Sequence, residues 1–149
     1  MAVYDAKYRR FGEPGWSPRM RLSFGYFSPD DVYEAVVARL VVPGCTWADV
    51  GCGRNIFPQN PRLEEELSRR CGFLLGIDPD ANIRDNPLLT EAFQGLVDDY
   101  VPSREFDLVT LRMVAEHITD PDRAMRSIGR MLKRGGMAVI YTPYKWAPV

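Results

Sequence analysis

The chain has 149 residues, of which 46% are apolar and 26% charged, so it can form one globular domain with its own hydrophobic core. Its formal net charge of −1 excludes a broad electrostatic attraction to nucleic acid or to an anionic membrane. No apolar run approaches the roughly 18 residues of a membrane span, and the polar first ten residues lack a signal-peptide core.

The first predicted elements follow an irregular lead-in, residues 1–27, whose aromatic side chains show no period. A Ser-Pro-Asp-Asp sequence from Ser28 predicts a helix start, because Ser caps helices, Pro fits the first helical position and acids favour the first turn. We expect this helix to end by Pro43. Residues 46–50 then predict a short buried strand that stops at Gly51.

Two helices and two strands are predicted in the middle of the chain. Asn60 and Pro61 form a second cap-and-proline helix start, and the apolar run 72–77 predicts the second strand. The signals that follow are weaker, and they indicate a short helix near residues 88–93 and a brief third strand at residues 96–97.

The last third of the chain repeats this alternation. Residues 106–111 predict a fourth strand, a helix begins at Asp120 and closes with residues 133–134, and residues 137–141 predict a fifth strand. The predicted inward face of this helix is Ala124, Ile128, Met131 and Leu132. Because apolar strands alternate with helices, we predict an α/β fold in three layers, with a mostly parallel sheet and helices on both of its faces.

Two strand ends carry residues suited to a nucleotide-like ligand. The first is the sequence Asp-Val-Gly-Cys-Gly at residues 49–53, where glycine lets the backbone approach a ligand closely. The second is Asp78, whose carboxylate can accept both hydroxyls of a ribose, although Asp78 and Pro79 also fit a plain turn. Open α/β sheets bind ligands at the carboxyl ends of their strands, where both segments are expected.

In their order and spacing, these segments resemble class I, Rossmann-like S-adenosylmethionine-dependent methyltransferases, and in particular the methyltransferase type 11 domain. The resemblance implies a lead-in at residues 1–27 and an S-adenosylmethionine-binding core at residues 28–149. The segments that carry it are residues 49–53 (motif I), 76–79 (the second-strand acid), 106–118 (the fourth strand and its Glu-His), 131–136 (the turn before strand five) and 142–143 (a Thr-Pro pair).

The resemblance implies S-adenosylmethionine as the cofactor, with S-adenosylhomocysteine as its product. Asp49 and the backbone around Arg112 would hold the methionine end, and Asp78 would hold the ribose hydroxyls. The glycine loop would pack against the cofactor, and Pro79 would lie near the adenine. The implied cofactor-binding residues are Asp49, Gly51, Cys52, Gly53, Asp78, Pro79, Asp98 and Arg112.

The sequence departs from the family pattern in four places, one of which is the unusually proline-rich loop at residues 56–61. Asn55 stands where motif I usually has a third glycine, and we expect the turn to survive because Asn tolerates left-handed conformations. The acid that usually follows the third strand aligns with Leu96, so Asp98, Asp99 or a backbone amide would bind adenine instead. The sequence ends after the fifth predicted strand, so we expect a fold that is truncated relative to the family, with an exposed strand edge that favours a homodimer.

His117, the only histidine, excludes a multi-histidine metal site, and we expect no metal. Histidine titrates near neutrality, so His117 is the candidate general base, with a structural role for the Glu-His pair as the alternative. Tyr4, Tyr8 and Tyr26 either line an acceptor pocket or pack in the core, and the arginines of residues 9–21 form either a basic patch or a solvated segment.

The leading hypothesis is methyl transfer from S-adenosylmethionine to a small-molecule acceptor, with neither nucleic acid nor membrane as partner. The alternative is a non-catalytic or incomplete S-adenosylmethionine-binding domain that acts in a complex or homodimer. A nicotinamide-dependent oxidoreductase is disfavoured, because Asp49 precedes the glycines and Ile56 replaces the third glycine of the dinucleotide motif. Three cysteines, an odd number without metal-ligand spacing, favour a reducing, cytoplasmic setting.

Overall fold

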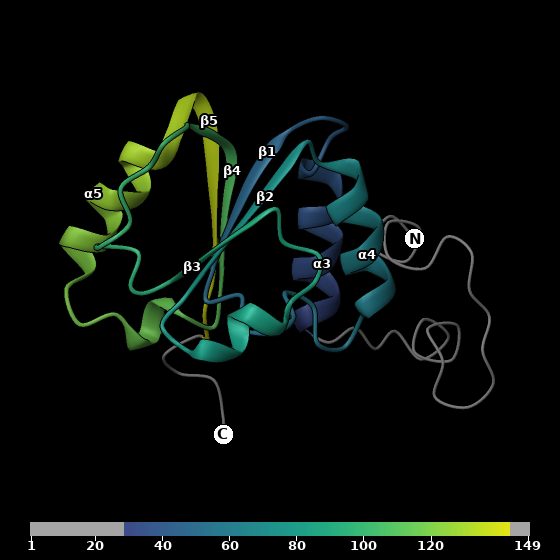
Figure 1. Cartoon of the computed structure of the whole chain (residues 1–149), viewed down its shortest axis with the longest axis horizontal. Helices are drawn as coiled ribbons and strands as arrows, with labels where there is room; N and C mark the ends of the chain where they lie inside the picture. The colour runs from purple at the N-terminus through teal and green to yellow at the C-terminus, as the bar shows by residue number, and fades with distance from the viewer. Residues whose placement is uncertain (1–28, 144–149) are drawn as a thin grey trace. The chain divides into compact units, whose positions relative to one another are not determined.

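The computed structural model describes residues 29–143, which fall into two units divided after Leu40 (Figure 1). The first unit contributes one described helix, α3 (Pro29–Leu40), with acids in its first turn and Arg39 in its last, where each charge complements the helix dipole. The second unit holds the sheet and every candidate site residue. The predicted lead-in, its tyrosines and its arginine cluster lie outside the described residues.

The second unit is built on a five-stranded sheet in the order β3-β2-β1-β4-β5. All four pairings between neighbouring strands are parallel. The order reverses between β1 and β4, which is where open α/β sheets bind their ligands. The strands are β1 (Thr46–Val50), β2 (Phe73–Asp78), β3 (Glu91–Gln94), β4 (Phe106–Arg112) and β5 (Leu132–Tyr141).

Helices α4 (Pro61–Arg70) and α5 (Pro121–Met131) cover opposite faces of this sheet, so the predicted three-layer α/β fold is confirmed (Figure 1). Both helices begin at the predicted caps. The Asn60 side chain accepts a hydrogen bond from the Leu63 amide at 3.3 Å, and the Asp120 side chain accepts one from the Arg123 amide at 3.0 Å. Within the described residues, no helix is long and apolar enough to cross a membrane.

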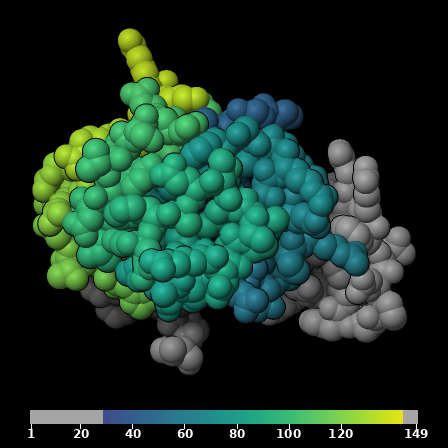
Figure 2. All heavy atoms as spheres, in the orientation of Figure 1, coloured from purple at the N-terminus to yellow at the C-terminus, as the bar shows by residue number. Residues whose placement is uncertain are grey.

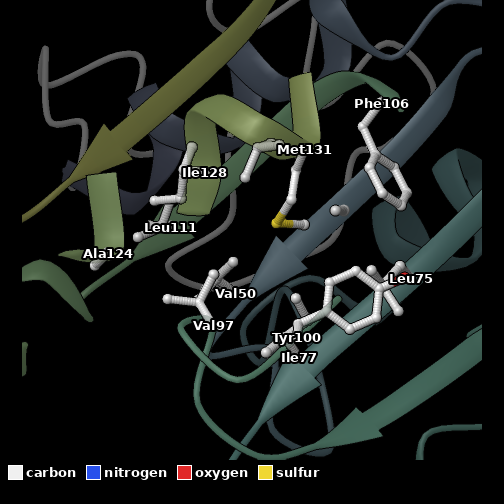
Figure 3. Packing of buried hydrophobic residues seen from close by; sticks show 12 residues of the cluster. Val50, Leu75, Ile77, Val97, Tyr100, Phe106, Leu111, Ala124, Ile128 and Met131 are labelled. Carbon is white, nitrogen blue, oxygen red and sulfur yellow. The ribbon is translucent and has the colours of Figure 1, made fainter. Parts of the chain in front are cut away.

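A hydrophobic core lies between the sheet and α5. Ala124, Ile128 and Met131 are at most 2% exposed and point from α5 onto side chains of β1, β2 and β4 (Figure 3). These three inward positions are therefore confirmed. Leu132, the fourth, is only half-buried, because it already belongs to β5.

Two predicted elements are wrong. The third strand is Glu91–Gln94 and not residues 96–97, and residues 88–93 do not form the predicted short helix. The helical turn of this region is instead the 3₁₀ helix η1 (Ala81–Asp85). The residues around η1 and β3 form much of the surface visible in Figure 2. Because β3 is mostly exposed, its sequence lacks the apolar run that marks the inner strands, and the prediction misplaced it.

The boundary between α5 and β5 also differs from the prediction. The helix ends at Met131 rather than at residues 133–134, and β5 begins at Leu132 rather than at Met137. Phe106 pairs with Leu132, and the register then shifts so that Leu108 pairs with Met137. The basic residues and glycines that suggest a helix end therefore form an irregular start of a strand.

Candidate functional site

The loops that follow β1 and β4 lie against each other at the point where the strand order reverses. Gly51 and Gly53 have φ values of +77° and +49°, in the left-handed region that favours glycine. A Cβ atom on Gly51 would stand 2.1 Å from Cγ2 of Val114, so only glycine fits there. Asn55 does not take the left-handed conformation expected of it, because the glycines make the turn before it.

Asp78, the last residue of β2, is joined directly to the glycine loop. Its Oδ2 accepts a hydrogen bond from the Gly53 amide at 2.8 Å, and its Oδ1 accepts one from the Asp80 amide at 2.8 Å. Each carboxylate oxygen keeps a second lone pair with which it can accept a ligand hydroxyl. The structure therefore brings Asp78 and the glycine loop together, as the motif spacing predicts.

Asp49 lies at the floor of this site in a chain of buried hydrogen bonds. The indole N–H of Trp47 donates to the Thr110 hydroxyl at 2.7 Å, and the hydroxyl donates to Asp49 Oδ2 at 2.5 Å. Burial, above all, raises the pKa of Asp49 to about 8; the charge of Glu64 raises it further, whereas the Thr110 hydrogen bond and the charge of Arg112 lower it. A cationic ligand group nearby would favour the ionised carboxylate.

The side chain of Cys52 points away from the glycine loop and into the core. A Cβ atom on Gly76 would lie 2.7 Å from Cys52 Sγ, so the thiol fills the space above that glycine in β2. Burial raises the pKa of the Cys52 thiol far above its ordinary value, with the charge of Asp49 as the next cause. The thiol is therefore unreactive, and only the Cys52 backbone is suited to contact a ligand.

The remaining predicted residues divide between the site and its surroundings. Arg112 ends β4 within electrostatic reach of Asp49, and Pro79 is exposed directly after Asp78. Asp98 instead lies 3.7 Å from Arg123 of α5, measured from Oδ2 to Nε, and its buried Oδ1 has no hydrogen-bond partner among the described residues. His117 is exposed in η2 (Ala115–His117), where its amide donates to the Val114 carbonyl.

Several residues of this region give no signal in the sequence. Asn82 lies beside the loop, since a Cβ on Gly53 would be 3.7 Å from its Oδ1. Met113, directly after β4, is the one non-glycine residue of positive φ in the described part of the chain, at 55°. Thr110 and Glu64 are buried polar side chains on elements that the apolar pattern alone had located. One signal for Glu64 exists: it falls on the same face of α4 as Leu63 and Leu67, where an amphipathic helix normally carries apolar residues.

Comparison with known proteins agrees with this geometry. Residues 17–147 match the family model for a methyltransferase domain. The ubiquinone biosynthesis O-methyltransferases of Rhodopseudomonas palustris and Bradyrhizobium are 28% and 26% identical to the chain, in alignments that are 157 positions long and cover 92% of it. The chain spans 59% and 60% of the length of these two relatives.

Solved structures show the same fold. The sugar N-methyltransferase KedS8 of Streptoalloteichus aligns with a TM-score of 0.60 at 22% identity, over 93% of this chain and 59% of its own. The N-methyltransferase NodS of Bradyrhizobium japonicum, solved with S-adenosylhomocysteine, aligns with a TM-score of 0.59 at 16% identity, over 94% and 72%. The chain therefore belongs to the methyltransferase-domain family, with its Rossmann-like class I α/β fold.

Proposed function

We propose that this chain binds S-adenosylmethionine at the carboxyl ends of β1, β2 and β4 and transfers its methyl group to a small molecule. The observation that carries this proposal is the hydrogen bond between Asp78 and the Gly53 amide, beside a left-handed glycine turn at the strand-order reversal. A carboxylate with unused lone pairs suits the two hydroxyls of a ribose, and a glycine turn suits close approach of the backbone.

The buried floor of the site suits the charged methionine end. When bound, the cofactor supplies an electrophilic methyl group on its sulfonium, so the protein has mainly to align an acceptor with that group. Asp49 would supply a negative charge toward the ammonium group, and the backbone around Arg112 would accept hydrogen bonds from it. The backbone from Gly51 to Gly53, Cys52 included, would pack against the cofactor.

Pro79, Asp98 and His117 are the candidates for the adenine contacts and for the general base. Pro79, exposed beside Asp78, would lie near the adenine. Asp98 would have to exchange its ion pair with Arg123 for the ligand and turn outward, because its unpartnered Oδ1 is buried. His117 is exposed after β4 and would act as a general base only where the acceptor carries a proton to remove.

The relatives and the exposed residues bear on the acceptor class, the oligomeric state and the cellular setting. The names of the relatives point to ubiquinone intermediates and to sugars, so we infer a small-molecule acceptor here. We also infer a homodimer, because β5 is an edge of the described sheet where Met137 and Ile140 are 49% and 42% exposed. All three cysteines carry free thiols, which suits the cytoplasm.

Calorimetric titration of the purified chain with S-adenosylmethionine and S-adenosylhomocysteine tests the proposal. Micromolar binding that Asp78→Ala weakens about 10-fold or more, which corresponds to about 1.4 kcal/mol, would support the site. Asp85→Ala is the matched control, because Asp85 is an exposed carboxylate in η1 close by in sequence. Failure of the wild-type chain to bind either ligand would contradict the proposal, and binding of a nicotinamide dinucleotide would favour an oxidoreductase.

Turnover is tested separately from binding. Binding of S-adenosylmethionine without methyl transfer to a panel of phenol, amine and sugar acceptors would favour the alternative of a non-catalytic binding domain. Light scattering over a range of concentrations tests the homodimer. A monomer at every concentration would contradict it.

A further inference from the structure

The roles above leave a fully buried carboxylate unexplained. Glu64 lies in the first turn of α4 and is 0% exposed, whereas its neighbours Glu65 and Glu66 pair at the surface with Arg69 and Arg70. Glutamate is rarely buried completely, because a carboxylate loses its hydration unless hydrogen bonds replace it. The partners that replace the water around Glu64 therefore indicate what it does.

Two of these partners belong to the loop that follows the glycine turn. The amide of Ile56 donates to Glu64 Oε1 at 3.0 Å, and the amide of Phe57 donates to Oε2 at 3.2 Å. Residues 54–60 form turns and bends rather than a helix or strand, so no regular ladder satisfies these amides. One carboxylate thus holds two consecutive amides of an otherwise irregular loop.

The third partner comes from the connection after β2. The side-chain amide of Asn86, which follows η1, donates to Glu64 Oε1 at 3.1 Å. Glu64 therefore ties the loop after β1 to the connection after β2. These are the two segments that begin beside Gly53 and Asp78, the pair proposed to contact the cofactor.

The loop is also coupled to the floor of the site. The buried ring of Phe57 stacks on Trp47 with centroids 6.2 Å apart and planes 28° apart, and Trp47 begins the hydrogen-bond chain to Asp49. Movement of the loop backbone would disturb both the stack and the position of the glycine turn. A carboxylate that fixes two amides removes this freedom before any ligand binds.

We propose that Glu64 is a positioning residue, whose carboxylate holds loop 54–60 and the η1 connection in the arrangement that binds the cofactor. The inference rests on the proposed S-adenosylmethionine site and adds a residue to it that does not touch the ligand. The loop of this chain has Asn55 in place of a third glycine and two prolines, Pro58 and Pro61, close behind. No regular ladder holds this loop, and the hydrogen bonds to Glu64 hold two of its amides instead.

The test replaces Glu64 with its neutral isostere and compares it with a neighbour. In Glu64→Gln the side-chain oxygen still accepts one amide, but the new NH₂ group faces the other, which is left without an acceptor. We expect hydrogen exchange at the Ile56 and Phe57 amides to become about 10-fold faster, and S-adenosylhomocysteine affinity to fall about 10-fold. Glu65→Gln, which loses only an exposed ion pair with Arg69, should change neither.

A second control separates positioning from loss of stability. Leu67 lies on the same helix and is 0% exposed, so Leu67→Ala destabilises the core without removing a hydrogen bond to the loop. It should leave S-adenosylhomocysteine affinity unchanged at temperatures where the variant is folded. If Glu64→Gln does not fold, Asn86→Ala removes one bond to Glu64, together with the acceptor of the Leu88 amide, and should weaken binding about 2- to 5-fold.

The outcomes distinguish this inference from the proposed function. If the wild-type chain binds S-adenosylhomocysteine and Glu64→Gln binds it as tightly as Glu65→Gln does, the inference is overturned and the proposed function stands. The same holds if Leu67→Ala weakens binding as much as Glu64→Gln does, because the effect would then follow from stability alone. A wild-type chain that binds neither cofactor nor product refutes the function and the inference together.

Discussion

Replacement of Asp49 by Asn should change the pH dependence of folding stability. The folded-state pKa of Asp49 is about 8, raised chiefly by burial from an ordinary value of 3.8. Between these values the folded chain keeps a proton that the unfolded chain releases. The contribution of the protonated carboxyl is therefore present below about pH 4 and is lost progressively as the pH rises toward 8.

The slope is that of a single proton, and the size of the pKa shift sets the width of the pH window. One pH unit inside this window changes the free energy of unfolding by up to about 1.4 kcal/mol, so the wild-type chain should lose about 3 kcal/mol from this group between pH 5 and pH 7. Asp49→Asn has no such proton, and its amide oxygen can still accept from the Thr110 hydroxyl. The variant should therefore gain stability relative to wild type by about that amount over the same range.

Urea unfolding at pH 5, 6 and 7, followed by circular dichroism, measures this difference. Asp107→Asn is the control of opposite sign. The pKa of Asp107 is lowered, first by its hydrogen bond with Lys133, so its contribution is present above an ordinary aspartate pKa and lost only as the pH falls through the lowered value. The difference in the free energy of unfolding between Asp107→Asn and wild type should stay constant from pH 5 to 7. An equally flat curve for Asp49→Asn would refute the reasoning.

Two further predictions concern the same region. Gly51→Ala should lower the free energy of unfolding by about 2 kcal/mol more than Gly44→Ala, because both glycines have φ near +80° but only the Cβ at Gly51 would collide with Val114. Equal losses in urea unfolding would show that the backbone conformation alone sets the cost. Trp47→Phe removes the donor to the Thr110 hydroxyl and should cost about 1–3 kcal/mol in the same assay. An unchanged stability would mean that the hydrogen-bond chain contributes nothing net.

The sequence predicts the inner part of the sheet well, for a physical reason. Strands β1, β2 and β4 are buried on both faces, so their sequences are apolar runs that lie between turn residues. Strand β3 is mostly exposed at an edge and carries no such run. Val97, whose apolar side chain suggests a strand at residues 96–97, lies in a loop and packs into the core from there. The start of β5 depends on its shifted register with β4, which no local signal encodes.

Some residues of the candidate site can likewise be predicted from the sequence, and others cannot. Asp49, Asp78 and the glycines can be picked out from the sequence because they stand at the predicted ends of strands, where the structure also places them. Trp47 and Thr110 are separated by 63 positions, and their contact exists only because β1 and β4 are neighbours. Glu64 looks like one acid among three on α4, and only its burial against the loop distinguishes it.

The stack between Trp47 and Phe57 also gives the protein an internal optical reporter. Trp47 is the one tryptophan in the part of the chain that the structure describes, and its indole is 0% exposed. Its ring contacts the loop held by Glu64, while its N–H joins the chain that ends on Asp49. Tryptophan emission, compared between wild type and Trp47→Phe, would therefore register loop order and the ionisation of Asp49 in one unlabelled spectrum.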